Sequence, residues 1–230
     1  MMAVEKIMAI EAAVSKIQNG NKVMIGGFGV PGTPFCLIDE LVRQGQSGLT
    51  IIKNDANQTG MGVDRLLENG QVDKLIVTHI GLNPRAIKMM NDHALAVEFC
   101  AQGILAERIR SAGAGLFGFL TDIGLGTDLD NGKTITELDG QPLLIEKALT
   151  ADFALVHASR ADAFGNLTYA ASARNFNPLM AMAADCVLAE TEQLVAMGEL
   201  QPEVIHTPGP FVDGVITLKQ LTESYGVIQR

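Results

Sequence analysis

Short apolar runs alternate along this chain with segments of helical character, and this alternation constrains the fold more than any other feature. Several of the runs are wholly apolar, which is typical of strands in a parallel sheet covered on both faces. The predicted strands are Lys22–Ile25, Leu49–Ile52, Leu75–Thr78, Ala96–Phe99, Phe153–Ala158 and Cys186–Ala189. The predicted helices are Pro34–Arg43, Val63–Glu68, Pro84–Asn91, Leu105–Ser111, Pro178–Ala184 and Glu192–Met197. The sequence therefore predicts an α/β fold, an open and mostly parallel sheet with helices on both faces and right-handed crossovers.

The segment 113–146 interrupts this alternation. It is rich in glycine and polar residues, and it contains Asp139-Gly140, a dipeptide that favours a tight hairpin turn. The turn joins residues 134–138 to a returning strand at Leu143–Ile145. We expect a β-hairpin excursion inside one domain that spans residues 1–230. At the start of the chain, apolar side chains at helical spacing between Val4 and Ile17 predict an amphipathic helix.

Composition disfavours several classes of function. The chain has 230 residues, enough for a substantial core, and its net charge of −9 opposes general binding to nucleic acid or to an anionic membrane surface. No apolar run reaches the roughly 18 residues needed to cross a bilayer. The N-terminus lacks the basic start and the continuous apolar core of a secretory signal. We therefore expect a soluble cytoplasmic protein.

Neither the cysteines nor the histidines follow the spacing of a metal site. The three cysteines are far apart in the sequence and lie in apolar settings, so we expect reduced core residues; they are Cys36, Cys100 and Cys186. The four histidines form no His-x-x-x-His pair, and they are His79, His93, His157 and His206. We expect no metal.

A glycine-rich turn (residues 26–32) follows the first predicted strand. Thr33-Pro34, directly after it, offers an N-cap and a first residue for the next helix. Such a turn aims backbone N–H groups into a crevice where anionic groups bind, and glycines let a bulky ligand approach the main chain. The spacing matches neither a Walker A loop nor G-x-G-x-x-G. A tight turn with glycines that serve only packing explains the residues equally well.

In open α/β sheets, ligands bind beyond the carboxyl ends of the strands. The loops predicted there carry glycine or polar amides; they are Gly26–Gly32, Lys53–Gly60, His79–Asn83, Cys100–Gly103 and Ser159–Asn166, with Ser172–Pro178 before a predicted helix.

Motifs in these loops resemble those of the alpha subunits of family I coenzyme A transferases. Residues 19–34 read N-G-x-x, three apolar residues, G-G-F, three residues and G-x-P. Further matching motifs are Lys53-Asn54-Asp55, Ile80–Pro84, Gln102–Gly115, Gly165–Tyr169 and Ser172–Pro178. Two positions depart from the family pattern: Ile104 replaces a threonine, and Ala112 replaces the first glycine of a pair. The resemblance extends over nearly the whole chain in register.

The resemblance implies an enzyme that moves coenzyme A between an acyl-CoA and a free short-chain acid such as acetate, butyrate or acetoacetate. In the family, a glutamate carboxylate attacks the thioester, and a ping-pong cycle follows through an acyl-glutamyl anhydride and a glutamyl-CoA thioester. That glutamate belongs to the beta subunit. The resemblance therefore implies a partner chain, in an α2β2 assembly, and coenzyme A as a substrate rather than a permanently bound cofactor.

The same resemblance assigns roles to residues of this chain. The side-chain amide of Gln102 would stabilise the oxyanion, and Asn54 is a second candidate, for substrate binding. The turn residues expected to contact CoA or the substrate are Gly26, Gly27, Phe28, Gly29, Val30, Pro31 and Gly32. Each role has a structural alternative: Gln102 bonded to its own helix backbone, and Asn54 stabilising a turn.

Two other functions remain open at this level. A sugar-phosphate isomerase or deaminase of related fold would need an acid/base pair within the chain, poised over a phosphosugar. A non-catalytic CoA-binding subunit would need only the turn. Fold analogy by itself does not choose among these functions.

Overall fold

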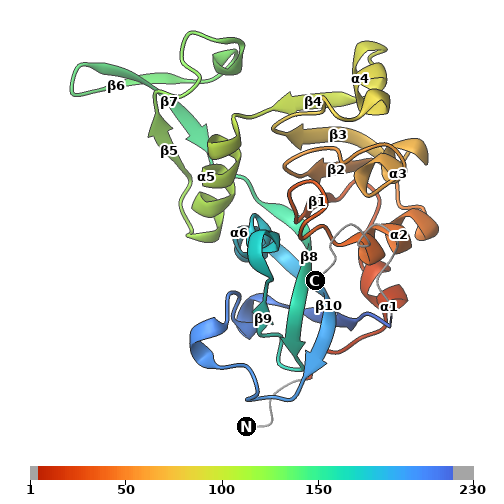
Figure 1. Cartoon of the computed structure of the whole chain (residues 1–230). Helices are drawn as coiled ribbons and strands as arrows, with labels where there is room; N and C mark the ends of the chain where they lie inside the picture. Colours follow the sequence, from red (N-terminus) through yellow and green to blue (C-terminus); the bar gives the residue numbers. More distant parts are fainter. Residues whose placement is uncertain (1–4, 220–230) are drawn as a thin grey trace.

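The structure of the protein is a computed structural model that describes residues 5–219. At its centre lies an eight-stranded sheet of order β11-β10-β8-β1-β2-β3-β4, with β9 paired to β8 (Figure 1). All pairings along that order are parallel, and only β9 runs antiparallel to its neighbour. The strands are β1 (Lys22–Ile25), β2 (Leu49–Ile52), β3 (Val72–Val77), β4 (Ala96–Phe99), β8 (Ala151–Asp162), β9 (Leu167–Thr168), β10 (Ala184–Val195) and β11 (Gly214–Thr217).

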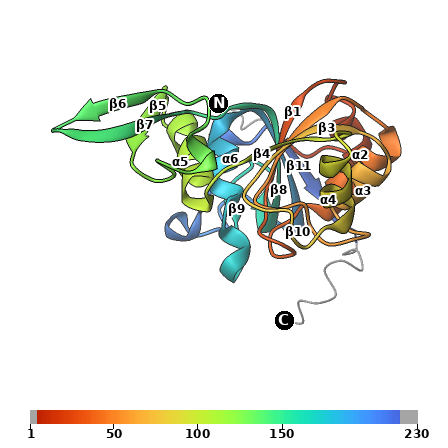
Figure 2. The same cartoon turned by 90° about the horizontal axis from the view of Figure 1, so that it is seen from above.

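Helices cover both faces of this sheet, as Figure 2 shows from above. One face carries α1 (Ile10–Val14), α2 (Phe35–Gln44), α3 (Val63–Glu68) and α4 (Pro84–Asn91), and the other carries α5 (Gln102–Gly113) and α6 (Asn177–Ala183). Successive strand residues divide between the two cores, because side chains alternate across a sheet. Ile25 packs with Leu37 on the α2 side, whereas Met24 packs with Met180 on the α6 side. The predicted fold class is confirmed.

The predicted hairpin is also confirmed. β6 (Ile135–Leu138) and β7 (Gln141–Lys147) pair antiparallel across Asp139 and Gly140, and β5 (Gly118–Thr121), which the sequence did not predict, adds a third strand. Asp139 has φ 52° and Gly140 has φ 78°, the left-handed conformations that a two-residue hairpin turn requires. This small sheet projects away from the main sheet (Figures 1 and 2).

Three expectations about local structure were wrong. Residues 192–195 continue β10 instead of forming a helix, because they stay in register with β8, with Gln193 opposite Arg160. The opening helix is shorter than predicted, since Ile7 forms a parallel bridge to Val215 and holds the chain extended there; Val4 lies outside the described residues. At α2, Pro34 occupies the N-cap position itself.

Short 3₁₀ helices complete the described chain: η1 (Asp128–Asp130), η2 (Ala171–Arg174), η3 (Pro202–Val204) and η4 (Gly209–Phe211). Within residues 5–219, no helix has both the length and the apolar character needed to span a membrane. The assignment of residues 1–230 to one domain stays a prediction.

Candidate functional site

The glycine-rich turn lies at the carboxyl end of β1, in the middle of the main sheet. The loops after β2 and β3 lie beside it, joined by a bridge between Asp55 and His79. α5 begins directly beyond β4, at Gln102. The edge where the sequence places the site therefore brings together segments from four successive strands, as a parallel sheet requires.

Asp55 fixes the turn from the β2 loop. Its Oδ2 accepts hydrogen bonds from the backbone N–H of Gly29, at 2.8 Å, and from Asn54 Nδ2, at 3.0 Å. Its Oδ1 accepts one from the N–H of Asn57, at 2.8 Å. Burial alone would raise the pKa of Asp55, but the Lys53 ammonium and these donors outweigh burial and hold the pKa below its ordinary value. The carboxylate is therefore ionised and committed to the turn.

Lys53 lies fully buried beneath the same turn. Its Nζ is 3.4 Å from Gly27 O and 3.6 Å from Asp55 Oδ2. Burial lowers the pKa of this lysine, and the neighbouring carboxylate only partly opposes the effect. Together with the bond from Asn57 Nδ2 to Gly29 O, at 2.8 Å, these contacts fix both N–H and C=O groups of the turn.

The structure brings the two predicted polar side chains into contact. Gln102 Nε2 donates to Asn54 Oδ1 at 2.7 Å, so its amide bonds across the site rather than to its own helix backbone. Asn54 is fully buried and is held from the other side by Thr78, whose hydroxyl donates to Asn54 O at 2.7 Å. An amide NH₂ carries two hydrogens, and Asn54 takes one of them. Catalytic or binding roles for these residues stay predictions.

A small cavity opens between the turn and the next two loops. Its volume is about 100 Å³, and its apolar lining includes Phe28, Val30, Met61 and Leu82, while Asp55 and His79 contribute polar groups. Phe28 is 47% exposed and Leu82 is 62% exposed, which is high for large apolar side chains. At roughly 30 Å³ per water molecule, the cavity holds about three waters, the size of a short acyl chain.

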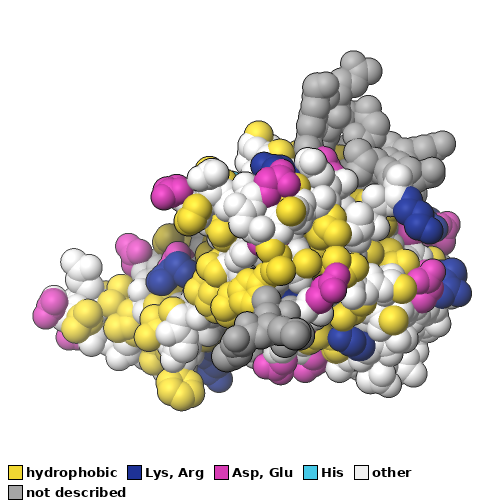
Figure 3. Space-filling view, turned by 90° about the horizontal axis from the view of Figure 1, so that it is seen from below, with side chains coloured by type: hydrophobic (Ala, Val, Ile, Leu, Met, Phe, Trp, Pro, Cys, Tyr) yellow, Lys and Arg dark blue, Asp and Glu magenta, His cyan; other side chains and the backbone are white. Residues whose placement is uncertain are grey.

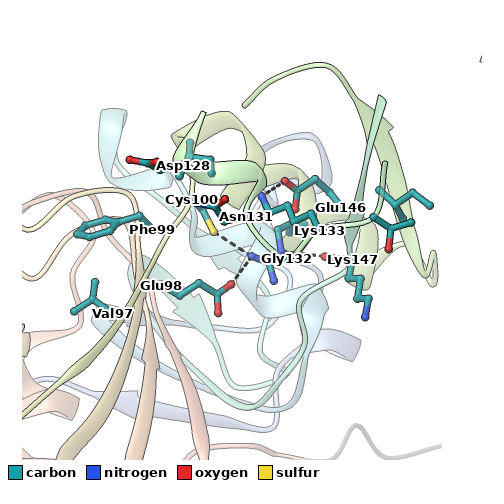
Figure 4. Close-up of a pocket in the computed structure, with 14 residues that line it drawn as sticks. Val97, Glu98, Phe99, Cys100, Asp128, Asn131, Gly132, Lys133, Glu146 and Lys147 are labelled. Atoms are coloured by element: carbon teal, nitrogen blue, oxygen red, sulfur yellow. Dashed lines mark hydrogen bonds and ion pairs between the residues drawn. The ribbon is translucent and has the colours of Figure 1, made fainter. Parts of the chain in front are cut away.

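A larger cavity of about 530 Å³ lies between the end of β4 and the small antiparallel sheet (Figure 4). Arg108 reaches across it: Nη1 lies 2.8 Å from Glu98 Oε1 and 3.1 Å from Cys100 Sγ, and Nε donates to Lys147 O at 3.0 Å. Lys133 forms an ion pair with Glu146. Because Arg108 and Lys133 are each paired with an acidic side chain that also lines the cavity, their positive charge is balanced and does not favour phosphate binding.

The cysteines do not suit nucleophilic chemistry. Cys36 and Cys186 are half-buried and Cys100 is buried, and all three are free of disulfides. Burial raises the pKa of Cys100 despite the nearby Arg108 guanidinium, and burial also raises the pKa of Cys186. Both thiols therefore stay protonated at neutral pH.

The four glycines of the turn differ in the space that a side chain would have at each position. A Cβ on Gly26 would lie 1.9 Å from Asn177 Oδ1, one on Gly27 would lie 2.2 Å from Thr33 Oγ1, and one on Gly32 would lie 2.4 Å from Ala173 O. A Cβ on Gly29 would meet nothing within 4 Å. Close packing explains three of the glycines, and only Gly29 faces open space.

Comparison with known proteins agrees with this architecture. A family model described as coenzyme A transferase matches residues 7–218. This chain belongs to the coenzyme A transferase family. Its fold also matches the solved acyl-CoA transferase YdiF of Escherichia coli O157:H7 in a thioester complex with CoA, with a TM-score of 0.88 at 22% identity; the match covers 98% of this chain and 49% of that one. The chain thus spans about half the length of that protein.

Several members of the coenzyme A transferase family match this chain along nearly its whole length. It is 48% identical over 217 residues to a probable coenzyme A transferase subunit alpha of Bacillus subtilis, covering 94% of this chain and 95% of the relative. It is 45% identical to the acetate CoA-transferase subunit alpha of Escherichia coli (94% and 98% covered). It is 44% identical to the acetoacetyl-CoA:acetate/butyrate CoA transferase alpha subunit of Clostridium acetobutylicum (92% and 97%).

Sequence reasoning missed several residues that build the site. Asp55 and Lys53 were quoted only as parts of a motif, although two charged groups directly after an apolar strand are a signal of buried polar structure. Asn177 carried no signal of its own, since nothing local shows that its amide reaches the turn. His157 lies more than thirty residues before Glu190 and Glu192, and only the pairing of β8 with β10 brings it to them.

Proposed function

We propose that this chain is the alpha subunit of a short-chain acyl-CoA:acetate or acetoacetate CoA-transferase. Relatives at 44–45% identity carry names that specify acetate and acetoacetyl-CoA as substrates. The observation that carries the proposal is the Gln102–Asn54 amide pair, which is bonded through Asn54 to Asp55, the residue that holds the glycine-rich turn and lines the small apolar cavity. Coenzyme A is a substrate in this proposal and not a resident cofactor, and the enzyme works in the cytoplasm.

The amide pair suits the hardest step of CoA transfer. When a carboxylate attacks a thioester, negative charge develops on the carbonyl oxygen, and preorganised N–H donors stabilise it. Gln102 supplies such a donor, and its orientation is fixed because Asn54 is buried and bonded on both sides. Backbone N–H groups of the turn add to the donors. Binding of the remote parts of CoA offsets the cost of orienting the carbonyl.

The nucleophile comes from another chain in this proposal. Asp55 is the carboxylate that lines the small cavity, and both of its oxygens are engaged with the turn and its own loop. A glutamate of a beta subunit would attack the thioester, form the acyl-glutamyl anhydride and release CoA thiolate. The thiolate attacks the glutamyl carbonyl of the anhydride, which forms the glutamyl-CoA thioester and releases the first acid. The second acid attacks this thioester, forms a new acyl-glutamyl anhydride and releases the thiolate. Attack of the thiolate on the acyl carbonyl of that anhydride gives the new acyl-CoA and frees the glutamate, which completes the ping-pong cycle. We propose an α2β2 assembly.

An exposed apolar surface supports the need for a partner. Leu120, Leu138, Leu143 and Ile145 share one face of the small antiparallel sheet, because residues opposite each other in register point the same way. Phe117, just before that sheet, is 99% exposed. Figure 3 shows hydrophobic side chains at the surface of this side of the molecule. We propose that the beta subunit covers this face, since contiguous exposed apolar surface marks interaction sites.

The test uses this chain with and without its proposed beta subunit. We expect CoA transfer from acetoacetyl-CoA to acetate only from the complex, with the CoA thioester trapped on a glutamate of the partner. Full activity from the isolated chain, or a thioester on this chain, would contradict the division of labour. Tight acetyl-CoA binding with no turnover in the complex would favour a non-catalytic subunit.

A further inference from the structure

A buried charged cluster beneath the glycine-rich turn has no part in the chemistry described so far. His157 and Glu190 lie opposite each other in register on β8 and β10. His157 Nδ1 is 2.8 Å from Glu190 Oε1, and His157 Nε2 is 3.0 Å from Glu192 Oε1. The His157 side chain is 3% exposed and that of Glu190 is 0% exposed. A carboxylate buried so deeply needs specific partners, because desolvation of an unpaired charge is costly.

The second oxygen of Glu190 bonds to the helix that leaves the turn. Oε2 accepts a hydrogen bond from the backbone N–H of Leu37, at 2.8 Å, in the first turn of α2. The first N–H groups of a helix have no partner within the helix, and side chains usually supply one. The N-cap residue of α2 is Pro34, which makes no side-chain capping bond. Glu190 therefore caps α2 from the sheet and fixes the place where the turn ends.

Asn177 holds the same turn from the opposite face of the sheet. This first residue of α6 is fully buried, and its Nδ2 donates to Gly32 O at 3.0 Å and to Ala173 O at 2.8 Å. Its Oδ1 accepts a bond from the backbone N–H of His157, at 3.2 Å. His157 thus connects the two supports: its imidazole bonds Glu190, and its main chain bonds Asn177.

We infer that Asn177 and Glu190 are positioning residues, which clamp the glycine-rich turn from both faces of the sheet and fix its backbone donors for CoA transfer. The inference rests on the proposed function, in which this turn contacts CoA or the substrate. Neither side chain lines the small cavity, so both act through the turn. Fixed donors matter because an error of about 1 Å in the placement of reacting groups costs on the order of a hundredfold in rate.

The charges around the cluster fit this role. Burial by itself would lower the pKa of His157, but Glu190 and Glu192 outweigh it and raise that pKa to about 9, so the imidazolium balances a buried carboxylate. On α2, Asp39 also feels the charge of Glu190, and it pairs with Arg65 of α3. A buried charged cluster whose members bond one another keeps its geometry, because moving one member leaves the other charges without partners.

The experiment compares the assembled complexes of Glu190→Gln, Glu190→Ala and Asn177→Ala with wild type. Glu203→Gln and Asn91→Ala change exposed residues and serve as matched controls. Hydrogen exchange followed by mass spectrometry reports on the segment 26–34, and steady-state kinetics gives kcat and KM for acetoacetyl-CoA. We expect at least tenfold faster exchange in this segment, with β2 and β3 unchanged, and at least a tenfold lower kcat with KM within about threefold.

Glu190→Gln should speed exchange and lower kcat less than Glu190→Ala does, because the amide oxygen of glutamine can still accept the hydrogen bond from the N–H of Leu37. If an alanine variant does not fold, Glu190→Gln and Asn177→Ser give the same comparison. Unchanged exchange in 26–34, or a lower kcat without faster exchange, would overturn the inference. If the wild-type complex transfers no CoA, the proposed function fails, and the exchange measurement still decides whether Asn177 and Glu190 hold the turn.

Discussion

Replacing Gly26 and Gly29 one at a time by alanine separates packing from ligand contact within a single turn. At Gly26, a Cβ would lie 1.9 Å from Asn177 Oδ1 and 2.7 Å from Asn177 Cγ, so the asparagine must move. Asn177 makes three hydrogen bonds, to Gly32 O, to Ala173 O and from His157 N, and a displaced side chain loses them. At about 0.5–1.5 kcal/mol each, Gly26→Ala should cost about 2–4 kcal/mol of folding free energy.

Gly29→Ala meets a different constraint. No atom lies within 4 Å of the added Cβ, but Gly29 has φ +59°, where alanine is disfavoured by about 1 kcal/mol. For a chain of this size, 1 kcal/mol corresponds to about 2–4 °C in Tm. We therefore expect Gly26→Ala to lower Tm by about 4–16 °C and Gly29→Ala by about 2–4 °C.

The two variants should change different kinetic parameters: Gly26→Ala displaces Asn177 and should lower kcat, as we expect of Asn177→Ala, whereas Gly29→Ala should act on KM. In the proposed function a ligand approaches the main chain at Gly29, where the new methyl group would stand, so we expect KM for acetoacetyl-CoA to rise at least tenfold in the folded complex. Thermal unfolding and steady-state kinetics on the same preparations give both numbers. The reasoning is refuted if Gly26→Ala melts within 1 °C or so of wild type, or if Gly29→Ala loses more stability than Gly26→Ala while its KM stays unchanged.

Three further changes test the site, the cluster and the subunit surface. Gln102→Glu replaces an N–H donor by a carboxylate, and we expect kcat to fall by roughly a hundredfold or more, because the developing oxyanion loses its donor; Glu107→Gln, on the exposed part of the same helix, is the control. The pKa of His157 is raised from 6.5 to about 9, so its stabilising contribution is complete below pH 6.5 and is lost as pH rises through about 9. In wild type, the free energy of unfolding measured with urea should fall as pH rises through about 9, and in His157→Gln this fall should be smaller. An equal pH dependence in both proteins would contradict the raised pKa of His157. Phe117→Asp should weaken binding to the beta subunit at least tenfold in titration calorimetry and leave the Tm of the isolated chain unchanged; an unaltered affinity would exclude this face.

The parallel sheet could be predicted from the sequence because its signal is local. β1, β2 and β4 have the predicted bounds; the apolar run of β1 ends at Gly26 and that of β2 ends at Lys53. The predicted helix at Glu192–Met197 was wrong because the contact that decides the structure of this segment is not local. Its pattern is compatible with a helix, and only the partner strand β8, more than thirty positions earlier, draws it into the sheet.

The site was only partly visible in the sequence. The resemblance pointed to Gln102 and Asn54, and the structure places them 2.7 Å apart, although their roles remain predictions. The supports of the turn could not be found in this way. Asn177 bonds Gly32 of the turn from 145 positions away, and Glu190 bonds Leu37, in the helix after the turn, from 153 positions away; no local pattern encodes such contacts.

The packing explanation for the glycine-rich turn holds at three of its four glycines, and ligand contact stays a prediction for the fourth. Gly26 and Gly32 leave room for the amide of Asn177, and Gly27 leaves room for Thr33, so these three serve packing. Gly29 faces open space, and in the proposed function a ligand contacts the main chain there while the other three positions hold the turn in place. Under that proposal, a mutation at one of the three packing positions reaches activity through loss of the turn's structure, whereas a mutation at Gly29 reaches it through direct contact with the ligand.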